Sequence, residues 1–394
     1  MELTYVTAGE SHGPGLTVVI SGLPAGLELE HDLIRRDLAR RQAGYGRSPR
    51  QKLEQDDAQP TGGLRHGRTL GSPLSFFIEN RDHKNWIDPM NAWPVSDEAL
   101  EEYGWRGKPI RLPRPGHADL PGTLKYGHED VRNVLERASA RETAARVAAG
   151  AVAKALIRTI GIEVRSHVLQ IGSVRATAPA WLSASDFDRA EASEVRCLDP
   201  TAEAAMVVEI EAAKGDRDTL GGVTEVRAFG VPPGLGSHVS AGQRLDGRLA
   251  AAMLSIQSAK GVEIGDAIAS SGRRGSSVHD EILYDEGRGF HRETDRAGGL
   301  EGGITNGADL VVRTIWKPLP TLMRPLRSVE LGNHEPREAH VERSDVTVLP
   351  AAAVVAEAAV AFELARAALE KFGGDAVEDF IAAHAAYTAR IDRA

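Results

Sequence analysis

Alanine-rich stretches with helical spacing are the sequence feature that most limits what this chain can fold into. In one of them the apolar residues recur three and four positions apart, as one face of a helix requires: Ala144, Val147, Ala148, Ala151, Val152, Ala155 and Leu156. A second stretch runs from Pro350 to Lys371 and is followed by two glycines. Because alanine leaves little side chain between two backbones, both helices are predicted to pack closely against other elements.

Short apolar runs elsewhere in the chain have the length and composition of β-strands. Strands are predicted at residues 16–20, 74–78, 164–174, 205–211, 223–229 and 310–315. Asp32 is predicted to cap a helix that ends at Gly44, and Ser240 to cap one that Gly261 closes. With helices and strands in comparable amounts, no repeat and no clean boundary, the sequence indicates one large α+β domain over residues 1–394.

Two regions are predicted to be long loops. Residues 81–115 are rich in Pro, Gly, Trp and charge and show little periodicity, which indicates a surface excursion. Residues 270–308 contain few apolar residues and many glycines, and apolar strand sequence resumes directly after them. We interpret the second region as loops at a functional site.

Composition restricts the class of protein. The 394 residues are 42% hydrophobic and 26% charged, as in soluble globular proteins, and the net charge of -9 argues against a general nucleic-acid binder. The single cysteine, Cys197, excludes an internal disulfide and fits a reducing compartment. No signal-peptide pattern and no membrane-spanning apolar stretch is found, so we expect a cytoplasmic protein without a membrane partner.

Positive charge is nevertheless concentrated in two windows. The first contains Arg35, Arg36, Arg40, Arg41, Arg47, Arg50 and Lys52, and the second Arg111, Arg114, Arg132, Arg137, Arg141 and Arg146. In an acidic chain these windows favour a pocket for a small anionic ligand, although solvated helix faces explain many such runs. In the second window Ser139 and Glu142 fit a capping box, and a helix N-terminus between two arginines suits phosphate or carboxylate.

The pentapeptide Gly9-Glu10-Ser11-His12-Gly13 holds a carboxylate, a hydroxyl and an imidazole between two glycines. Glycine lets a ligand approach the backbone closely, and histidine exchanges a proton near neutral pH. The segment also matches the Gly-x-Ser-x-Gly nucleophile elbow, which would make Ser11 the nucleophile of a hydrolase. Only ten residues precede Ser11, and a strand rather than a helix follows, so this alternative is the weaker one.

Other common site motifs are missing. There is no dinucleotide-binding glycine pattern after the first strand and no phosphate-binding Gly-Lys-Ser/Thr loop. His334-Glu335 lacks the second histidine of a zinc motif and is followed by a proline, so no metal site is predicted.

Taken together, the motifs resemble those of the chorismate synthase family. They follow one another in family order at residues 9–24, 41, 44–47, 114–119, 136–143, 218–222, 261–265, 297–303, 317–321 and 343–345. The resemblance implies a β-α-β sandwich, a homotetramer and the elimination of phosphate and a ring hydrogen from 5-enolpyruvylshikimate 3-phosphate to give chorismate. It also implies reduced FMN as cofactor without net redox change, with NADPH or an external flavin reductase as the source of electrons.

The resemblance assigns roles to individual positions. His12 would protonate the departing phosphate, His117 would protonate or stabilise the reduced flavin, and Asp345 would take part in removing the ring proton. Contacts to substrate or reduced nicotinamide fall on Ser11, Arg41, Arg47 and Arg141. Flavin contacts fall on Arg137, Ala138, Ser139, Gln257, Ser258, Gly302, Lys317, Pro318, Leu319, Pro320, Thr321 and Arg343.

Three other functions remain open at this point: a Ser11 hydrolase, another flavin-dependent enzyme that binds anions, and an anion-binding protein without catalysis.

Overall fold

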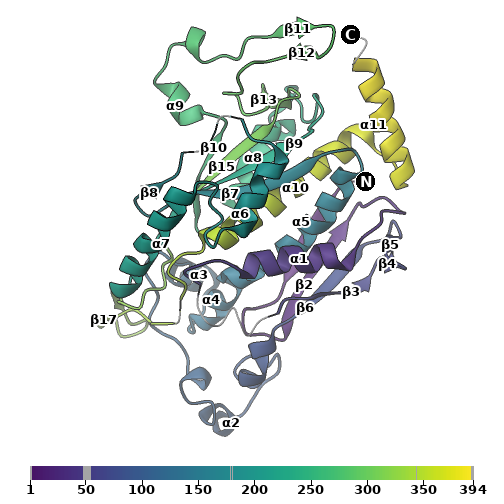
Figure 1. Cartoon of the computed structure of the whole chain (residues 1–394). Helices are drawn as coiled ribbons and strands as arrows, with labels where there is room; N and C mark the ends of the chain where they lie inside the picture. Colours follow the sequence, from purple (N-terminus) through teal and green to yellow (C-terminus); the bar gives the residue numbers. More distant parts are fainter. Residues whose placement is uncertain (1, 48–54, 178, 180, 343, 392–394) are drawn as a thin grey trace.

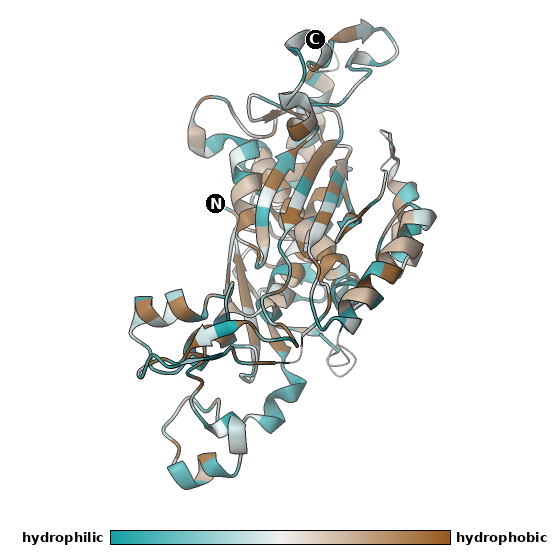
Figure 2. Cartoon of the chain, turned by 90° about the vertical axis from the view of Figure 1, so that its left-hand side faces the viewer, coloured by the Kyte–Doolittle hydropathy of each residue, from teal (hydrophilic) through white to brown (hydrophobic). Residues whose placement is uncertain are grey.

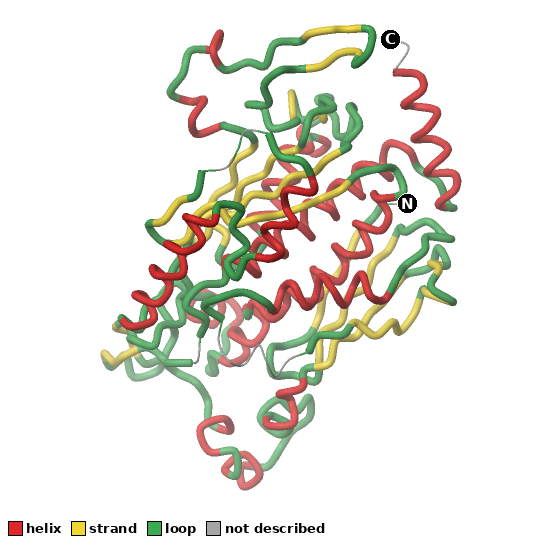
Figure 3. Tube along the Cα trace, viewed as in Figure 1, coloured by secondary structure: helices red, strands yellow, loops and turns green. Residues whose placement is uncertain are grey.

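Two antiparallel sheets enclose a layer of helices in this computed structural model, which describes residues 2–47, 55–177, 179, 181–342 and 344–391 (Figures 1 and 3). The first sheet has the order β1 (Thr4–Ala8), β2 (Gly15–Ser21), β6 (Leu74–Glu79) and β3 (Ala58–Gly62). The second has the order β10 (Ala259–Ile264), β15 (Leu310–Trp316), β9 (Gly222–Phe229), β7 (Glu163–Ile171) and β8 (Val174–Arg175). The predicted β-α-β sandwich is confirmed.

The helices between the sheets are α1 (His31–Gln42), α5 (Thr143–Arg158), α8 (Leu245–Leu254) and α10 (Leu349–Phe372). The two predicted alanine-rich helices, α5 and α10, are confirmed, and they pack directly on each other. At their contact a Cβ atom added to Gly150 would collide with Ala358. Small residues therefore let two long helices share one thin layer, with α5 also against the first sheet and α10 also against the second.

Shorter elements surround this body. The helices are α2 (Asp97–Glu101), α3 (Asp119–Tyr126), α4 (Arg132–Ala138), α6 (Asp188–Ala192), α7 (Pro200–Gly215), α9 (Ala267–Ser271) and α11 (Val377–Ile391). Single-turn 3-10 helices are η2 (Arg81–Asn85), η3 (Gly104–Gly107), η4 (Ala140–Glu142), η5 (Ala184–Phe187), η6 (Ala241–Gln243) and η7 (Gly275–Ser277). Two-stranded hairpins are β4 (Leu64–Arg65) with β5 (Arg68–Thr69), β11 (Leu283–Asp285) with β12 (Gly289–His291), β13 (Leu300–Glu301) with β14 (Ile304–Thr305), and β16 (Arg327–Val329) with β17 (Pro336–Glu338).

One predicted strand is wrong. Residues 205–211 lie inside helix α7, whose first turn is capped by the Asp199 side chain. The buried residues of α7 are Ala202, Met206, Ile210 and Ala213, which are spaced as one helix face requires. The adjacent valines suggested a strand, but Val208 is 70% exposed on the opposite face, so the period of burial is that of a helix.

Several helix ends also differ from the prediction. Helix α1 begins at His31, so Asp32 lies in its first turn and is not the cap. Helix α8 begins at Leu245, after η6, and Gly261 lies in strand β10. Ser139 caps only η4, because its hydroxyl accepts from Arg141 N (3.3 Å) while the Glu142 carboxylate bonds other groups. The capping box is therefore wrong.

The excursion at residues 81–115 is confirmed: its helices are short, and the part that carries α2 extends away from the sandwich (Figure 1). Its largest buried side chain is Trp86, which is 4% exposed and stacks on the ring of His12. Apolar colour runs along the strands and helices of the sandwich in Figure 2. No helix in the described part of the chain is both long and apolar enough to span a bilayer.

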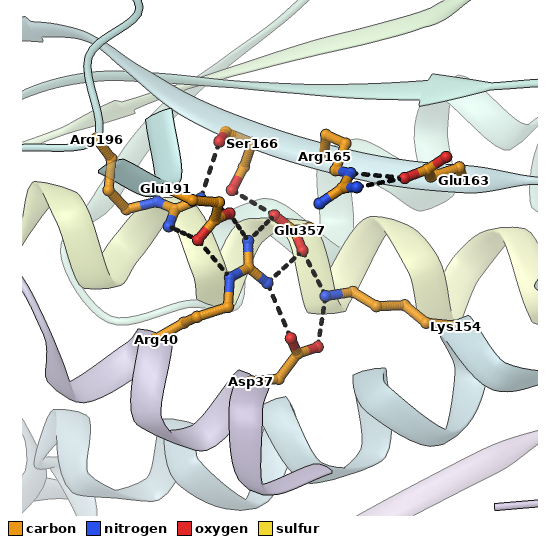
Figure 4. Close-up of polar contacts among 9 residues, drawn as sticks. All are labelled: Asp37, Arg40, Lys154, Glu163, Arg165, Ser166, Glu191, Arg196 and Glu357. Atoms are coloured by element: carbon orange, nitrogen blue, oxygen red, sulfur yellow. Dashed lines mark hydrogen bonds and ion pairs between the residues drawn. The ribbon is translucent and has the colours of Figure 1, made fainter. Parts of the chain in front are cut away.

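A buried charge network fixes the helical layer to the second sheet (Figure 4). Glu357 of α10 accepts hydrogen bonds from Arg40 of α1 (2.8 and 2.9 Å), Ser166 of β7 (2.6 Å) and Lys154 of α5. Asp37 of α1 accepts from the same two cations, at 2.9 Å from Arg40 and 2.6 Å from Lys154. The network joins the three helices that converge on the site described next.

Candidate functional site

A cavity of about 470 Å³ opens where α1, α4, α5 and α10 meet the loop after β1 and the segment after β15. The side chains predicted for a site that line it are Ser11, His12, Arg41, Arg47, His117, Ala138, Ser139, Arg141, Gln257, Ser258, Lys317, Leu319, Pro320, Thr321 and Asp345. These residues come from distant parts of the chain, and the fold brings them to one place.

The loop that carries Ser11 and His12 joins β1 to β2 and needs glycine at its start. Gly9 has φ of +106°, and a Cβ there would collide with the carbonyl oxygen of Gly15. The glycine-bracketed pentapeptide therefore forms a turn, and the strand predicted after it is confirmed as β2.

Three predicted residues are placed differently, and a fourth is not described. Arg137 donates to the carbonyl oxygens of Gly9 (3.1 Å) and Thr7 (2.9 Å), so it supports the His12 loop from outside the cavity lining. Gly302 lies between β13 and β14, where its carbonyl accepts from Arg244, and Pro318 lines a separate cavity. Arg343 lies outside the described residues. None of residues 270–308 lines the main cavity of this chain, so their interpretation as site loops gains no support.

His12 is held by a carboxylate that sequence reasoning gave no role. Its Nδ1 lies 2.8 Å from Glu136 Oε1, its backbone N–H donates to Glu136 Oε2 (2.8 Å), and Ser11 N donates to the Glu136 carbonyl (3.1 Å). The ring also stacks on Trp86, with centroids 4.2 Å apart. A carboxylate on Nδ1 favours the tautomer in which Nδ1 carries the proton, and this leaves Nε2 for chemistry.

His117 forms a second histidine–carboxylate pair. Its Nδ1 makes a short hydrogen bond to Asp119, which also accepts from Arg114 N (3.0 Å) and Nε (2.8 Å). Burial would raise the pKa of Asp119, but the hydrogen bonds from His117 and Arg114 hold it well below its usual range. Asp119 is therefore a carboxylate that fixes the orientation of His117.

Three guanidinium groups line the cavity in addition to that of Arg114, which pairs with Asp119 and Glu342. The side chains of Arg41, Arg47 and Arg141 are 6%, 9% and 8% exposed. Burial lowers the pKa of Arg41 to about 10 and also lowers that of Arg47, whose Nε lies 3.2 Å from Asp345 Oδ2. Burying several guanidinium charges in one cavity costs free energy of solvation. Such a cluster suits an anionic ligand, since guanidinium binds phosphate and carboxylate through paired hydrogen bonds.

Another part of the cavity lining can accept a flat heteroaromatic ring. Gln257 donates to Glu142 (3.2 Å), but its buried Oε1 has no hydrogen-bond partner in the described part of the chain, so it offers an acceptor. Apolar side chains that line the same cavity are Leu135, Ile256, Trp316, Val348 and Val355. An unpaired acceptor in a cavity with these apolar side chains fits the flavin that the resemblance implies.

Lys317 lines the same cavity. Its Nζ donates to the Gly116 carbonyl (2.6 Å), next to His117, and its backbone N–H donates to Ser258 O (3.0 Å). Burial, together with the charge of Lys260, lowers the pKa of Lys317. The lysine thus connects two of the predicted flavin-contacting segments, its own and that of Ser258, to the segment of His117.

Comparisons with known proteins identify relatives over almost the full length. Residues 3–369 match the family described as chorismate synthase. The chorismate synthase of Symbiobacterium thermophilum is 57% identical over 395 residues, which cover 99% of this chain and 100% of the relative. That of Bacillus subtilis is 51% identical over 377 residues, covering 95% and 96%. A solved structure described as chorismate synthase matches with a TM-score of 0.80 and 39% identity, covering 100% of this chain and 99% of the other.

Proposed function

The chain belongs to the chorismate synthase family, and we propose that the cavity around His12, Arg41 and Arg141 is where it performs the reaction of that family. This carbon–oxygen lyase reaction of the shikimate pathway eliminates phosphate and a ring hydrogen from 5-enolpyruvylshikimate 3-phosphate and yields chorismate. The observation that carries the assignment to this cavity is the pairing of two carboxylate-bound histidines with three buried arginines.

The arginines would bind the substrate through its charges. The substrate carries one phosphate and two carboxylates, and each presents pairs of oxygen acceptors that match the guanidinium fork. Arg41, Arg47 and Arg141 line the cavity with their charge largely screened from bulk water, which strengthens their attraction for anions. Binding there would place the leaving phosphate among these side chains.

His12, protonated on both ring nitrogens and with its Nδ1–H held by Glu136, would supply the proton on Nε2 to the leaving phosphate and would remain as the neutral Nδ1–H tautomer. Glu136 holds Nδ1 and Trp86 stacks on the ring, so the imidazole has one fixed direction into the cavity. A positioned general acid is the usual way to assist a leaving group. Asp345, which lines the same cavity beside Arg47, would accept the ring proton.

The family requires a reduced flavin, and we propose FMN, reduced by NADPH or by an external reductase. The residues that would hold it are Ala138, Ser139, Gln257, Ser258, Lys317, Leu319, Pro320 and Thr321. When bound, reduced flavin lends an electron to the reaction and recovers it, so no net redox change occurs. His117, oriented by Asp119, would hold a proton toward the flavin.

The hydrolase alternative lacks a base for its nucleophile. Among the described residues Ser11 Oγ accepts a hydrogen bond from Ser139 Oγ (3.2 Å), whereas the neighbouring His12 ring is turned to Glu136. A nucleophilic serine needs a general base within hydrogen-bond distance of its hydroxyl. Ser11 is better explained as a residue that positions the loop beside the flavin.

The test of the proposed function is an anaerobic incubation with 5-enolpyruvylshikimate 3-phosphate and chemically reduced FMN. We expect phosphate and chorismate to appear in equal amounts, and neither to appear when flavin is omitted. Absence of both products with reduced FMN would contradict the proposal, and phosphate release without flavin would favour a hydrolase. Repeating the assay in air with NADPH distinguishes self-reduction of FMN from dependence on a separate reductase.

By resemblance we further propose that the whole chain acts as one catalytic domain, in the cytoplasm, and as a homotetramer. Sedimentation velocity at several protein concentrations measures the assembly directly.

Replacing Glu136 with glutamine is expected to lower kcat by about 10-fold to 100-fold, as for other residues that orient a functional histidine. Glutamine keeps the shape but puts an N–H group against one of the donors of His12, so the ring loses its fixed direction. The KM for substrate should change much less, because Glu136 does not line the cavity. Steady-state kinetics measure both.

The control for this variant is Glu129→Gln, at an exposed position just before α4. Normal kcat in both variants, or an equal loss in both, would count against the orienting role of Glu136.

A further inference from the structure

Asp56 lies behind the cavity and joins two of its arginines. Its Oδ1 accepts from Arg141 Nη1 at 2.6 Å, and its Oδ2 accepts from Arg41 Nη1 at 3.3 Å. The side chain has no solvent exposure, and it is not part of the cavity lining. One buried carboxylate therefore serves two guanidinium groups that face the proposed substrate.

Each arginine is also held by neutral acceptors. Arg41 donates from Nε to Thr143 Oγ1 (2.9 Å) and from Nη2 to the Ala140 carbonyl (3.0 Å). Arg141 donates from Nε to Asn80 Oδ1 (2.8 Å). These contacts come from the α5 end and from the first sheet, so the orientation of each guanidinium is specified by the surrounding fold.

Asn80 connects this group to the histidine loop. Its Nδ2 donates to the carbonyl oxygens of Glu10 (3.0 Å) and Gly13 (2.8 Å), on either side of His12. The contacts thus run without interruption from Asp56 through Arg141 and Asn80 to the His12 loop. A shift of Arg141 would be transmitted to the place where the leaving phosphate is proposed to lie.

Two buried guanidiniums side by side repel each other unless a negative charge lies between them. Burial and the charges of Arg141 and Arg47 lower the pKa of Arg41, and the charge of Asp56 opposes them. Two opposed bonds to one carboxylate also set the distance between the two arginines.

We propose that Asp56 is a positioning residue that holds Arg41 and Arg141 at the spacing required by the substrate anions, without touching the substrate itself. The inference rests on the proposed function of the cavity. It assigns a role in substrate affinity to Asp56, a residue that lies outside the cavity lining and has no motif around it in the sequence.

The test is Asp56→Asn. The amide keeps the volume but turns one N–H group toward a guanidinium donor, so one arginine must move. We expect the KM for 5-enolpyruvylshikimate 3-phosphate to rise by about 10-fold to 100-fold, the effect of losing one hydrogen bond to a charged group. The kcat at saturating substrate should fall much less, and inhibition by inorganic phosphate should weaken in parallel.

The matched control is Asp57→Asn at the adjacent residue, whose exposed carboxylate bonds His31 and Gln59 instead of the cavity arginines. Its kinetic constants should equal those of the unmodified enzyme. A double-mutant cycle with Arg141→Lys adds a second criterion: if Asp56 acts through Arg141, the two effects on KM are less than additive.

An unchanged or lower KM in Asp56→Asn, or full additivity with Arg141→Lys, would overturn the inference. Should Asp56→Asn not fold, Asp56→Glu takes its place. Glutamate keeps the charge but displaces both guanidiniums by one methylene. A normal KM in this variant would also overturn the inference. Turnover by the unmodified enzyme in the same assay separates the two claims: without it the proposed function fails, and with it only the role of Asp56 is in question.

Discussion

Replacing His12 with alanine is expected to lower kcat by about 10²-fold or more, the usual cost of losing general acid–base catalysis. The imidazole lines the cavity and has two fixed neighbours, Glu136 at Nδ1 and the Trp86 ring. Alanine removes the proton donor and leaves space that water would enter. Anaerobic turnover with reduced FMN, followed by phosphate release, measures the loss.

His117→Ala should give a loss of the same order, but for a different reason. His117 is held by Asp119 beside the segment of Lys317, where the flavin is proposed to bind, so this variant should also alter flavin affinity. His31→Ala is the control, because that histidine is half exposed on α1 and pairs with Asp57 outside the cavity. Near-normal rates in both cavity variants would remove the histidines from the mechanism.

Replacing Glu357 with glutamine is expected to cost about 3–5 kcal/mol of the free energy of unfolding, since it leaves buried cations without their partner. Glu357 is 1% exposed and accepts hydrogen bonds from Arg40, Lys154 and Ser166 (Figure 4). Glutamine keeps the shape but removes the charge and turns an N–H group toward one of these donors. Urea unfolding, followed by tryptophan fluorescence at one fixed protein concentration, measures the change.

The control is Glu370→Gln on the same helix, where the carboxylate is 42% exposed and pairs with Arg248. An exposed pair contributes about 1 kcal/mol or less. An equal loss of stability in both variants would contradict a special role for the buried network.

The pH dependence has a definite sign. Burial would raise the pKa of Glu357, but Arg40 and Lys154 hold it well below its usual range. A depressed pKa contributes stability that is present above the unfolded-state pKa of about 4.3 and is lost as the pH falls through the folded-state value. The difference in the free energy of unfolding between the unmodified chain and Glu357→Gln should therefore be largest at neutral pH and should decrease in strong acid.

Much of the fold was predictable because its signals are local. The helix near residues 144–156 and the long helix after Pro350 are confirmed as α5 and α10. Four of the six predicted strands are confirmed with shifted ends, and the run 164–174 divides into β7 and the start of β8, which pair as a hairpin. Periodic burial over one element is encoded in the residues of that element. The exception, α7, combines a strand-like pair of valines with a helical burial period, and only packing decided between them.

The side chains that lie in sequence motifs could be predicted for the cavity. The contacts between residues far apart in the chain could not. His12, His117, Arg41 and Arg141 all line the cavity, as the resemblance implied. No local pattern pairs His12 with Glu136, because the two residues are 124 positions apart. Asp56 and Asn80 gave no signal either, since each is an ordinary polar residue until the chain places Arg141 beside it.

The sequence by itself determined the two alanine-rich helices, most strands, the family and the side chains that we propose to react. The tertiary structure alone decided which carboxylate holds each histidine, which charge lies between the arginines, and how α1, α5 and α10 are joined by Glu357. The reason is physical. Helical and strand periods arise between near neighbours, whereas a buried charge is stable only beside a partner that folding brings to it from another part of the chain.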